Sequence, residues 1–282
     1  MARRPSIGEM VLGGIIVALV AFVASQVVAA SPTKRAATTT RSLTGRDSAS
    51  IASQYRSQVA ARRGAYDVPA WLADIQIARL QAAAMRDVAG QDSAARPGAD
   101  SLRAMVATAA HGTYLRAMLT EDGDIVTRWR ERVDPIGVWV QPHSQEAGFS
   151  AELISPTHRA FTAWNEVGLP VAFAIVDDST AADVHVTWSA KMPEATQLGT
   201  TFRMTGGAGY VAFAHVVLST SYDIYTVQNA ARHEAGHVLG LGHSPESRDI
   251  MAAATEGRQY QLTDADRATV GWLYRLPPGK MN

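Results

Sequence analysis

Cysteine is absent from this chain of 282 residues. Disulfide bonds, thiolate metal sites and a cysteine nucleophile are therefore excluded, so any metal ion must be bound by nitrogen and oxygen atoms. A surplus of charge is also absent, because the formal net charge is zero, which gives no reason to expect a nucleic acid as partner. The length and the 47% of hydrophobic residues allow one sizeable globular domain with additional segments.

The N-terminus contains a long apolar run, from Met10 to Ala30, which Arg3 and Arg4 precede. As a helix, this run of 21 residues would extend about 31 Å, which is enough to cross a bilayer. We therefore predict an uncleaved membrane anchor over residues 1–30. The alternative is a secretory signal peptide that is cleaved before Ser31, after a group of small residues. On either interpretation the rest of the chain is extracytoplasmic, either tethered to the membrane or secreted.

A linker and a helical region follow. Residues 31–46 are rich in Thr, Ser, Ala and Arg and lack apolar periodicity, which is typical of a flexible linker. Residues 47–120 form the helical N-terminal region, in which we predict three helices at about Ser48–Arg63, Ala70–Ala89 and Ala99–Leu119. This region contains no catalytic constellation, and packing or spacing is its predicted role.

The pattern changes after Pro135, where short strands and helices alternate. Strands are predicted at Ile136–Val140, Val171–Val176, Val184–Trp188, Leu198–Met204 and Tyr210–Leu218. Helices are predicted from Ser155 to about Glu166, from Tyr225 to Leu239 and from Thr263 to Tyr274. This order of elements indicates a mixed α/β or α+β domain over residues 121–282.

The most informative segment reads HEAGHVLGLGH. His233 and His237 are four residues apart on a predicted helix, so both imidazoles project from one face. Gly240 allows a sharp, left-handed exit from the helix, which can bring His243 round as a third ligand. Three neutral imidazoles leave one position on Zn²⁺ open for water, and Glu234 can reach that water without binding the metal. The segment therefore predicts a catalytic zinc site with Glu234 as general base.

This segment resembles the zinc-binding signature of the metzincin peptidases, HExxHxxGxxH followed by a methionine turn. It is most similar to the matrixins, because Ser244 follows the third histidine and Met251 lies eight residues beyond that histidine. Looser similarity extends over about Ile125 to Leu276. The resemblance implies a twisted, mixed five-stranded sheet, an active-site helix and a C-terminal helix, with Met251 as an apolar floor under the metal.

The sequence also departs from the matrixin pattern. Ala252 and Ala253 follow the methionine where matrixins usually have a proline at the second position, which puts the pocket wall there in doubt. The cysteine that keeps animal matrixins latent is missing, as are the ligands of their second, structural zinc in the short segment after Trp188, so we predict one zinc. Family members often bind Ca²⁺, which Asp177 and Asp178 could help to hold, but a plain acidic turn is favoured.

The other histidines are predicted to bind no metal. His185 lies on the polar face of its strand and is expected to face solvent or to form a hydrogen bond. His215 interrupts an apolar strand and is expected to be a hydrogen-bonded, partly buried residue. His111 is assigned a structural or surface role, and His143 and His158 have no metal-ligand spacing.

The predicted function is hydrolysis of peptide bonds in extracytoplasmic proteins. Substrates would bind in extended form along the strand at Leu198–Met204, through main-chain hydrogen bonds. Two other classes stay open, namely a membrane-tethered binding or scaffold protein with an inactive metal site, and a hydrolase of non-peptide amides or short peptides. Residues 31–120 would hold the protease away from the membrane, or else act as an inhibitory propeptide that caps the zinc through a carboxylate or His111.

Overall fold

The computed structural model describes residues 50, 53, 55, 70–89, 97–206, 209–254 and 261–281, all within one compact unit, Arg41–Asn282. The predicted anchor at 1–30, the predicted linker at 31–46 and nearly all of the predicted helix Ser48–Arg63 lie outside the described residues. Over the part of the chain that is described, no helix combines the length and the apolar character that a membrane span requires.

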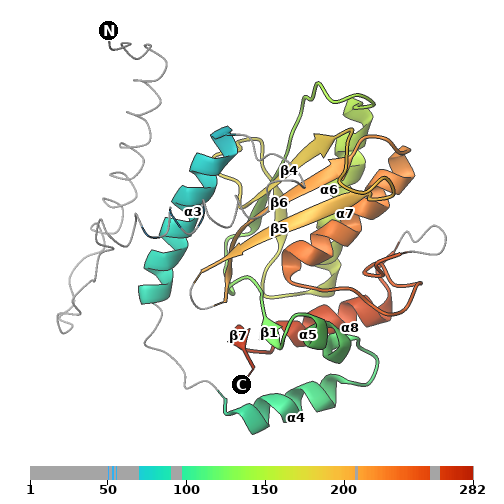
Figure 1. The fold of residues 1–282 in the computed structure, drawn as a ribbon. Coiled ribbons are helices and arrows are strands. Elements are labelled where there is room, and N and C mark those ends of the chain that lie inside the picture. The colour runs from blue at the N-terminus through green and yellow to red at the C-terminus, as the bar shows by residue number, and fades with distance from the viewer. Residues whose placement is uncertain are drawn as a thin grey trace. The chain divides into compact units, whose positions relative to one another are not determined.

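After the helical residues 50, 53 and 55, the described part of the chain continues with α3 at Ala70–Ala89, α4 at Ala99–Ala109 and α5 at Leu115–Glu121 (Figure 1). The bounds of α3 agree with the prediction. The single helix predicted over Ala99–Leu119 is wrong, because the chain turns between α4 and α5. Gly112 lies in this turn with a φ of 75°, a left-handed conformation that a continuing right-handed helix does not contain.

A five-stranded sheet forms the centre of the fold. Its strands are β2 (Ile136–Val140), β3 (Phe173–Ile175), β4 (Val184–Ser189), β5 (Gly199–Thr205) and β6 (Val211–Ser219). The order is β3-β2-β4-β6-β5, and all neighbours are parallel except β5, which pairs antiparallel with β6 at one edge. The mixed five-stranded sheet that the resemblance implied is therefore confirmed, and each strand lies within two residues of its predicted bounds.

Helices α6 (Ile154–Thr162) and α7 (Ile224–Leu239) cover one face of this sheet (Figure 1). Short 3₁₀ helices flank α6, at Ala151–Leu153 and Ala163–Val167. The C-terminal helix α8 spans Asp264–Leu273, and a small antiparallel pair joins β1 (Ile125–Val126) to β7 (Gly279–Lys280). Thr263 begins α8 with a capping box, since its hydroxyl accepts from the Asp266 amide while the Asp266 carboxylate accepts from the Thr263 amide.

The opposite face of the sheet is covered by α3. Alternate residues of a strand point to opposite faces, and β6 has every residue buried, which is typical of a strand covered on both sides. Phe213 packs in a small apolar cluster with Leu80 of α3, whereas Ala214 and Val216 belong to the large core. The region for which packing or spacing was predicted therefore contributes a layer to the fold.

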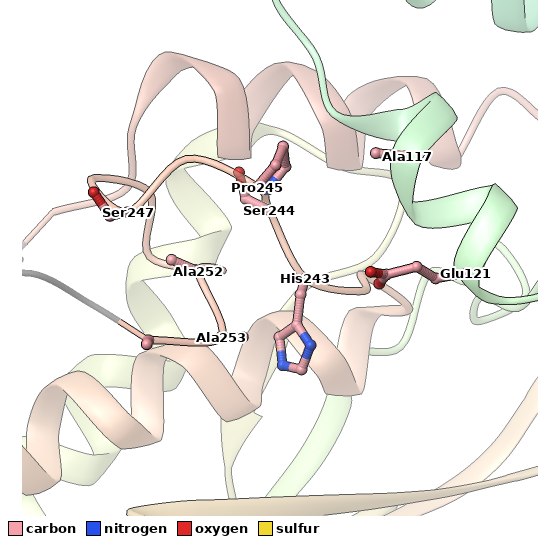
Figure 2. Close-up of a pocket in the computed structure, with 9 residues that line it drawn as sticks. Ala117, Glu121, His243, Ser244, Pro245, Ser247, Ala252 and Ala253 are labelled. Atoms are coloured by element: carbon pink, nitrogen blue, oxygen red, sulfur yellow. The ribbon is translucent and has the colours of Figure 1, made fainter.

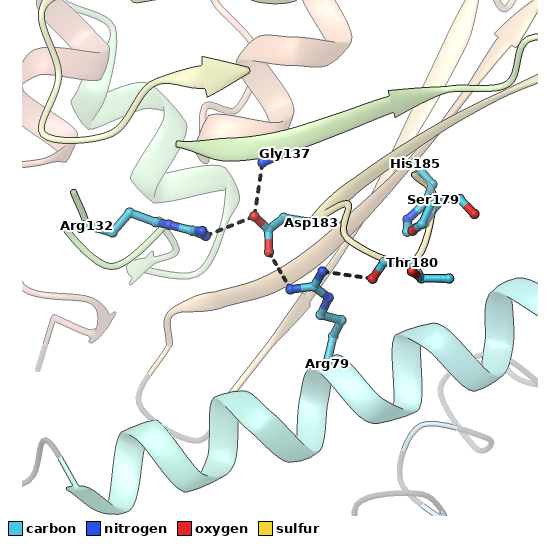
Figure 3. Close-up of polar contacts among 7 residues, drawn as sticks. All are labelled: Arg79, Arg132, Gly137, Ser179, Thr180, Asp183 and His185. Atoms are coloured by element: carbon cyan, nitrogen blue, oxygen red, sulfur yellow. Dashed lines mark hydrogen bonds and ion pairs between the residues drawn. The ribbon is translucent and has the colours of Figure 1, made fainter. Parts of the chain in front are cut away.

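The carboxylate of Asp183, the residue directly before β4, attaches α3 to the sheet (Figure 3). Asp183 is only 7% exposed and accepts from Arg79 of α3 at 3.1 Å and from Arg132 at 3.0 Å. The Gly137 amide also donates to Asp183, at 3.1 Å. Arg79 donates in addition to the carbonyl of Thr180, at 3.1 Å. One acidic group thus joins three segments that are far apart in the sequence.

Candidate active site

Helix α7 carries the predicted zinc-binding residues, and both of its ends are defined by specific residues. The Asp223 side chain caps the first turn by accepting from the amides of Tyr225 and Thr226. Gly240 ends the helix with a φ of 115°. A Cβ atom on Gly240 would lie 2.1 Å from the carbonyl oxygen of Thr127, so only glycine fits. This turn redirects the chain toward the third histidine.

The structure brings the three predicted ligands together. One ring nitrogen from each of His233, His237 and His243 can be chosen so that all lie within 4.8 Å of one another. The Nδ1 atoms of His233 and His237 lie 2.7 and 2.8 Å from the carbonyl oxygens of Ile250 and Leu241. A carbonyl only accepts, so each Nδ1 carries the proton and Nε2 keeps a free lone pair.

The electrostatics of this cluster fit a zinc ion. Burial lowers the pKa of His233 to about 4 and lowers the pKa of His237 well below its usual range, so both rings are neutral at pH 7. His243 is exposed and completes the group from the side of solvent. Catalytic zinc sites typically have three protein ligands, such as three neutral imidazole nitrogens, and a fourth coordination position that is left for water.

Glu234 lies in the same turn of helix and is only 5% exposed. Burial raises the pKa of its carboxyl group to about 7, against the opposing effects of a hydrogen bond from Thr201 and of the charge of Arg203. The Thr201 hydroxyl donates to Oε2 over 2.5 Å. A buried carboxyl group that titrates near neutral pH is suited to accept and return a proton.

Met251 lies beneath this part of α7 and is fully buried. Its sulfur would lie 2.3 Å from a Cβ atom on Gly236, so the glycine between the two helical histidines gives the methionine its space. Ser244 donates from its amide to the Met251 carbonyl at 2.8 Å. The methionine turn is thereby joined to the residue that follows the third histidine.

Two buried carboxylates hold the methionine turn in place. Asp249 accepts from the Ser244 hydroxyl at 2.6 Å. Asp266 of α8 accepts from the Ile250 amide at 3.0 Å and from the Tyr114 hydroxyl at 3.1 Å. Tyr114 directly precedes α5, so the helical N-terminal region contacts the support of the site. Burial and the nearby Asp266 carboxylate raise the pKa of Tyr114, which therefore keeps its donor proton.

A pocket of about 350 Å³ opens beside His243 (Figure 2). Its other lining residues are Ala117, Glu121, Ser244, Pro245, Ser247, Ala252, Ala253 and Ala254. Small side chains thus line the wall after the methionine, where the resemblance had expected a proline. Ala117 and Glu121 belong to α5, and their place in this lining could not be predicted, because no motif or spacing links α5 to the zinc-binding segment.

The remaining predicted residues lie away from this cluster. His185 is 1% exposed, and its Nε2 lies 2.8 Å from the Ser179 carbonyl oxygen. The expected hydrogen bond is present, but exposure to solvent is wrong, because α3 covers that face of the sheet. His215 is fully rather than partly buried and pairs with the Thr187 hydroxyl at 2.9 Å. His111 lies exposed in the turn after α4.

The predicted calcium position is an acidic turn in which the Asp178 carboxylate accepts from the amide and hydroxyl of Thr180. Within the described ranges, a single group of three or more side chains has metal-ligand geometry, and it consists of the three histidines. That the protein binds one zinc stays a prediction.

Comparison with known proteins agrees with this geometry. Residues 139–275 match a family model described as Matrixin. The chain is also 28% identical over 187 residues to Metalloendoproteinase 1-MMP of Arabidopsis thaliana, in an alignment that covers 61% of this chain and 49% of that protein. The chain thus spans about half the length of this relative. The family match includes α7, the third histidine, the methionine turn and α8.

Proposed function

The chain carries a matrixin-like catalytic domain at residues 139–275, and on this premise we propose that it is a zinc-dependent endopeptidase. His233, His237 and His243 would hold the metal, and Glu234 would act as general base. The observation that carries the proposal is the convergence of three imidazole nitrogens within 4.8 Å beside a buried carboxyl group whose pKa is raised to about 7.

The chemistry proposed for Glu234 is proton transfer. A zinc ion bound by the three histidines would supply a Lewis acid and would lower the pKa of water toward about 7. Glu234 takes a proton from the attacking water and later gives it to the leaving amine. Burial raises the pKa of Glu234 above its usual range, which favours a carboxyl group that takes up and returns a proton. Burial keeps bulk solvent away from this exchange.

The proposed substrate site is the free edge of β5. Among the described residues this strand pairs with β6 on one side only, so its outer edge offers main-chain donors and acceptors to an extended peptide. The face of β5 that points toward α7 reaches Glu234, since Thr201 donates to its carboxylate. A peptide paired with β5 would therefore run past the metal ligands, which favours cleavage within long chains.

The substrates proposed are extracytoplasmic proteins or peptides, and the protein would be held at the membrane by residues 1–30 or secreted after their removal. The alternative of a membrane-tethered binding protein with an inactive metal site is not favoured. All three ligand positions and the base are present, and the ligands converge as a working site requires.

A cleavage assay on a library of long peptides, with sequencing of the products, tests the proposal. We expect internal cleavage that a zinc chelator abolishes and that added Zn²⁺ restores, with no hydrolysis of dipeptides. Cleavage of dipeptides or non-peptide amides alone would instead support the short-substrate hydrolase. A zinc-loaded protein that cleaves nothing would support the inactive binding protein.

A further inference from the structure

Three residues of β5 face α7 because they alternate along the strand. Gly199, Thr201 and Arg203 follow one another at every second position, so they share one face of the sheet. All three lie against residues of the zinc-binding segment, through close approach or hydrogen bonds. The strand whose outer edge is proposed to bind substrate therefore also contacts the catalytic groups through its side chains.

Gly199 and Thr201 together confine the side chain of Glu234. A Cβ atom on Gly199 would lie 2.8 Å from both Cγ and Oε1 of Glu234, so the carboxyl group lies directly against the strand. The Thr201 hydroxyl is 2.5 Å from Oε2 and 3.3 Å from the main-chain oxygen of Glu234. One carboxylate oxygen thus has a defined partner, which fixes the rotation of the group.

Arg203, the third of these residues, contacts the C-terminal end of α7. Its Nη1 atom donates to the carbonyl of His237 and lies 3.4 Å from the carbonyl oxygen of Leu241. The Leu241 carbonyl is also the acceptor for Nδ1 of His237, at 2.8 Å. The guanidinium therefore holds the carbonyl that sets the tautomer and orientation of the second metal ligand. It also joins the end of α7 to the turn that leads to His243.

From this arrangement we propose that Thr201 and Arg203 are positioning residues, Thr201 for the carboxylate of Glu234 and Arg203 for the imidazole of His237. The proposal rests on the proposed function, because it assigns roles relative to that base and that metal. Partners of metal-ligating histidines typically change metal affinity or activity by about 10- to 100-fold when they are removed. We expect loss of the Thr201 hydroxyl to lower turnover, and loss of the Arg203 guanidinium to lower the affinity for the metal.

The Thr201 part is tested with Thr201→Val and Thr201→Ser. Valine keeps the β-branched shape that suits a strand and removes only the hydroxyl, whereas serine keeps the hydroxyl. We expect Thr201→Val to lower kcat about 10-fold or more, with KM within about twofold and zinc content unchanged, and Thr201→Ser to stay within about threefold of the wild type. Thr162→Val is the matched control, because its hydroxyl donates within α6 to the His158 carbonyl.

The Arg203 part has a readout that needs no turnover, namely the zinc dissociation constant measured by competition with a chromophoric chelator. We expect Arg203→Gln to weaken zinc binding about 10- to 100-fold, and Arg203→Lys, which can reach one of the two carbonyls, to have a smaller effect. Arg159→Gln is the control, because the Arg159 side chain is exposed and donates to the Ser155 hydroxyl on the surface of α6. If Arg203→Gln does not fold, Arg203→Lys decides the question.

The outcomes separate this inference from the proposed function. Unchanged kcat in Thr201→Val, or loss of kcat to the same extent in Thr201→Ser, would overturn the role of Thr201 while peptide cleavage by the wild type still stands. Unchanged zinc affinity in both Arg203 variants would overturn the role of Arg203. A wild type that binds zinc but cleaves no peptide would overturn the proposed function and the Thr201 part together, and the Arg203 part would still be decided by zinc affinity.

Discussion

Removing the Arg79 guanidinium should loosen α3 from the sheet and lower the free energy of unfolding by about 1–2 kcal/mol. The Arg79→Met variant keeps the apolar stem but loses two bonds of 3.1 Å, to the Asp183 carboxylate and to the Thr180 carbonyl. A hydrogen bond to a charged group contributes about 1.5–3 kcal/mol, whereas an exposed ion pair contributes at most about 1 kcal/mol. Arg79 is 25% exposed and Asp183 is 7% exposed, so an intermediate value is expected.

A double-mutant cycle in urea isolates the pair. Asp183→Asn should cost more than Arg79→Met, because it also leaves Arg132 and the Gly137 amide without their charged acceptor. The coupling energy between positions 79 and 183 should be about 1 kcal/mol, and Arg103→Met, whose partner Asp100 is exposed, should have almost no effect. A coupling energy near zero would mean that α3 does not bind the sheet through Asp183 in solution.

Three further predictions concern acid stability, the end of α7 and the metal. Burial lowers the folded-state pKa of His185 to about 4 and of His215 to about 3, so the unfolded chain binds more protons below about pH 6.5. The stabilisation should therefore be fully present above that pH and should fall by about 2 kcal/mol per histidine by pH 5. A flat profile of unfolding free energy from pH 7.5 to 5 in denaturant titrations would contradict this. Gly240→Ala should lower the free energy of unfolding by about 2 kcal/mol or more and reduce the zinc content, because alanine disfavours a φ of 115° and its Cβ would meet the Thr127 carbonyl. Normal thermal stability with full zinc content would refute the steric argument. The purified protein should contain about one zinc per chain, and two tightly bound zinc ions by elemental analysis would show that a second site exists.

Much of the fold could be predicted because local patterns determine it. The apolar alternation of β4, the apolar run of β6 and the glycine that ends α7 are local signals, and the structure contains each of these elements within two residues of its predicted bounds. The three histidines could be predicted to meet because four-residue spacing on a helix and a glycine exit fix their geometry over a short segment. These features need no knowledge of distant contacts.

The parts that could not be predicted depend on packing between distant segments. The polar face of its strand left His185 open to solvent exposure or to a hydrogen bond, and the position of α3 buries the ring, which forms the hydrogen bond. Thr201 lies 33 residues from Glu234 in the sequence, and a hydroxyl on a strand has no spacing that links it to a helix so far away. The helix break near Gly112 was missed because the apolar periodicity continues across it into α5.

The measurement that tests the central claim most directly is the turnover of zinc-loaded Glu234→Ala on one long peptide. The proposed mechanism predicts that this variant keeps one zinc per chain, because Glu234 is not a ligand, and loses at least about 10²- to 10⁴-fold in kcat. Glu166→Ala is the matched control, because Glu166 is exposed and forms an ion pair with Arg267 on the surface. Near-normal turnover in the zinc-loaded Glu234→Ala protein would contradict the assignment of the base and with it the proposed mechanism.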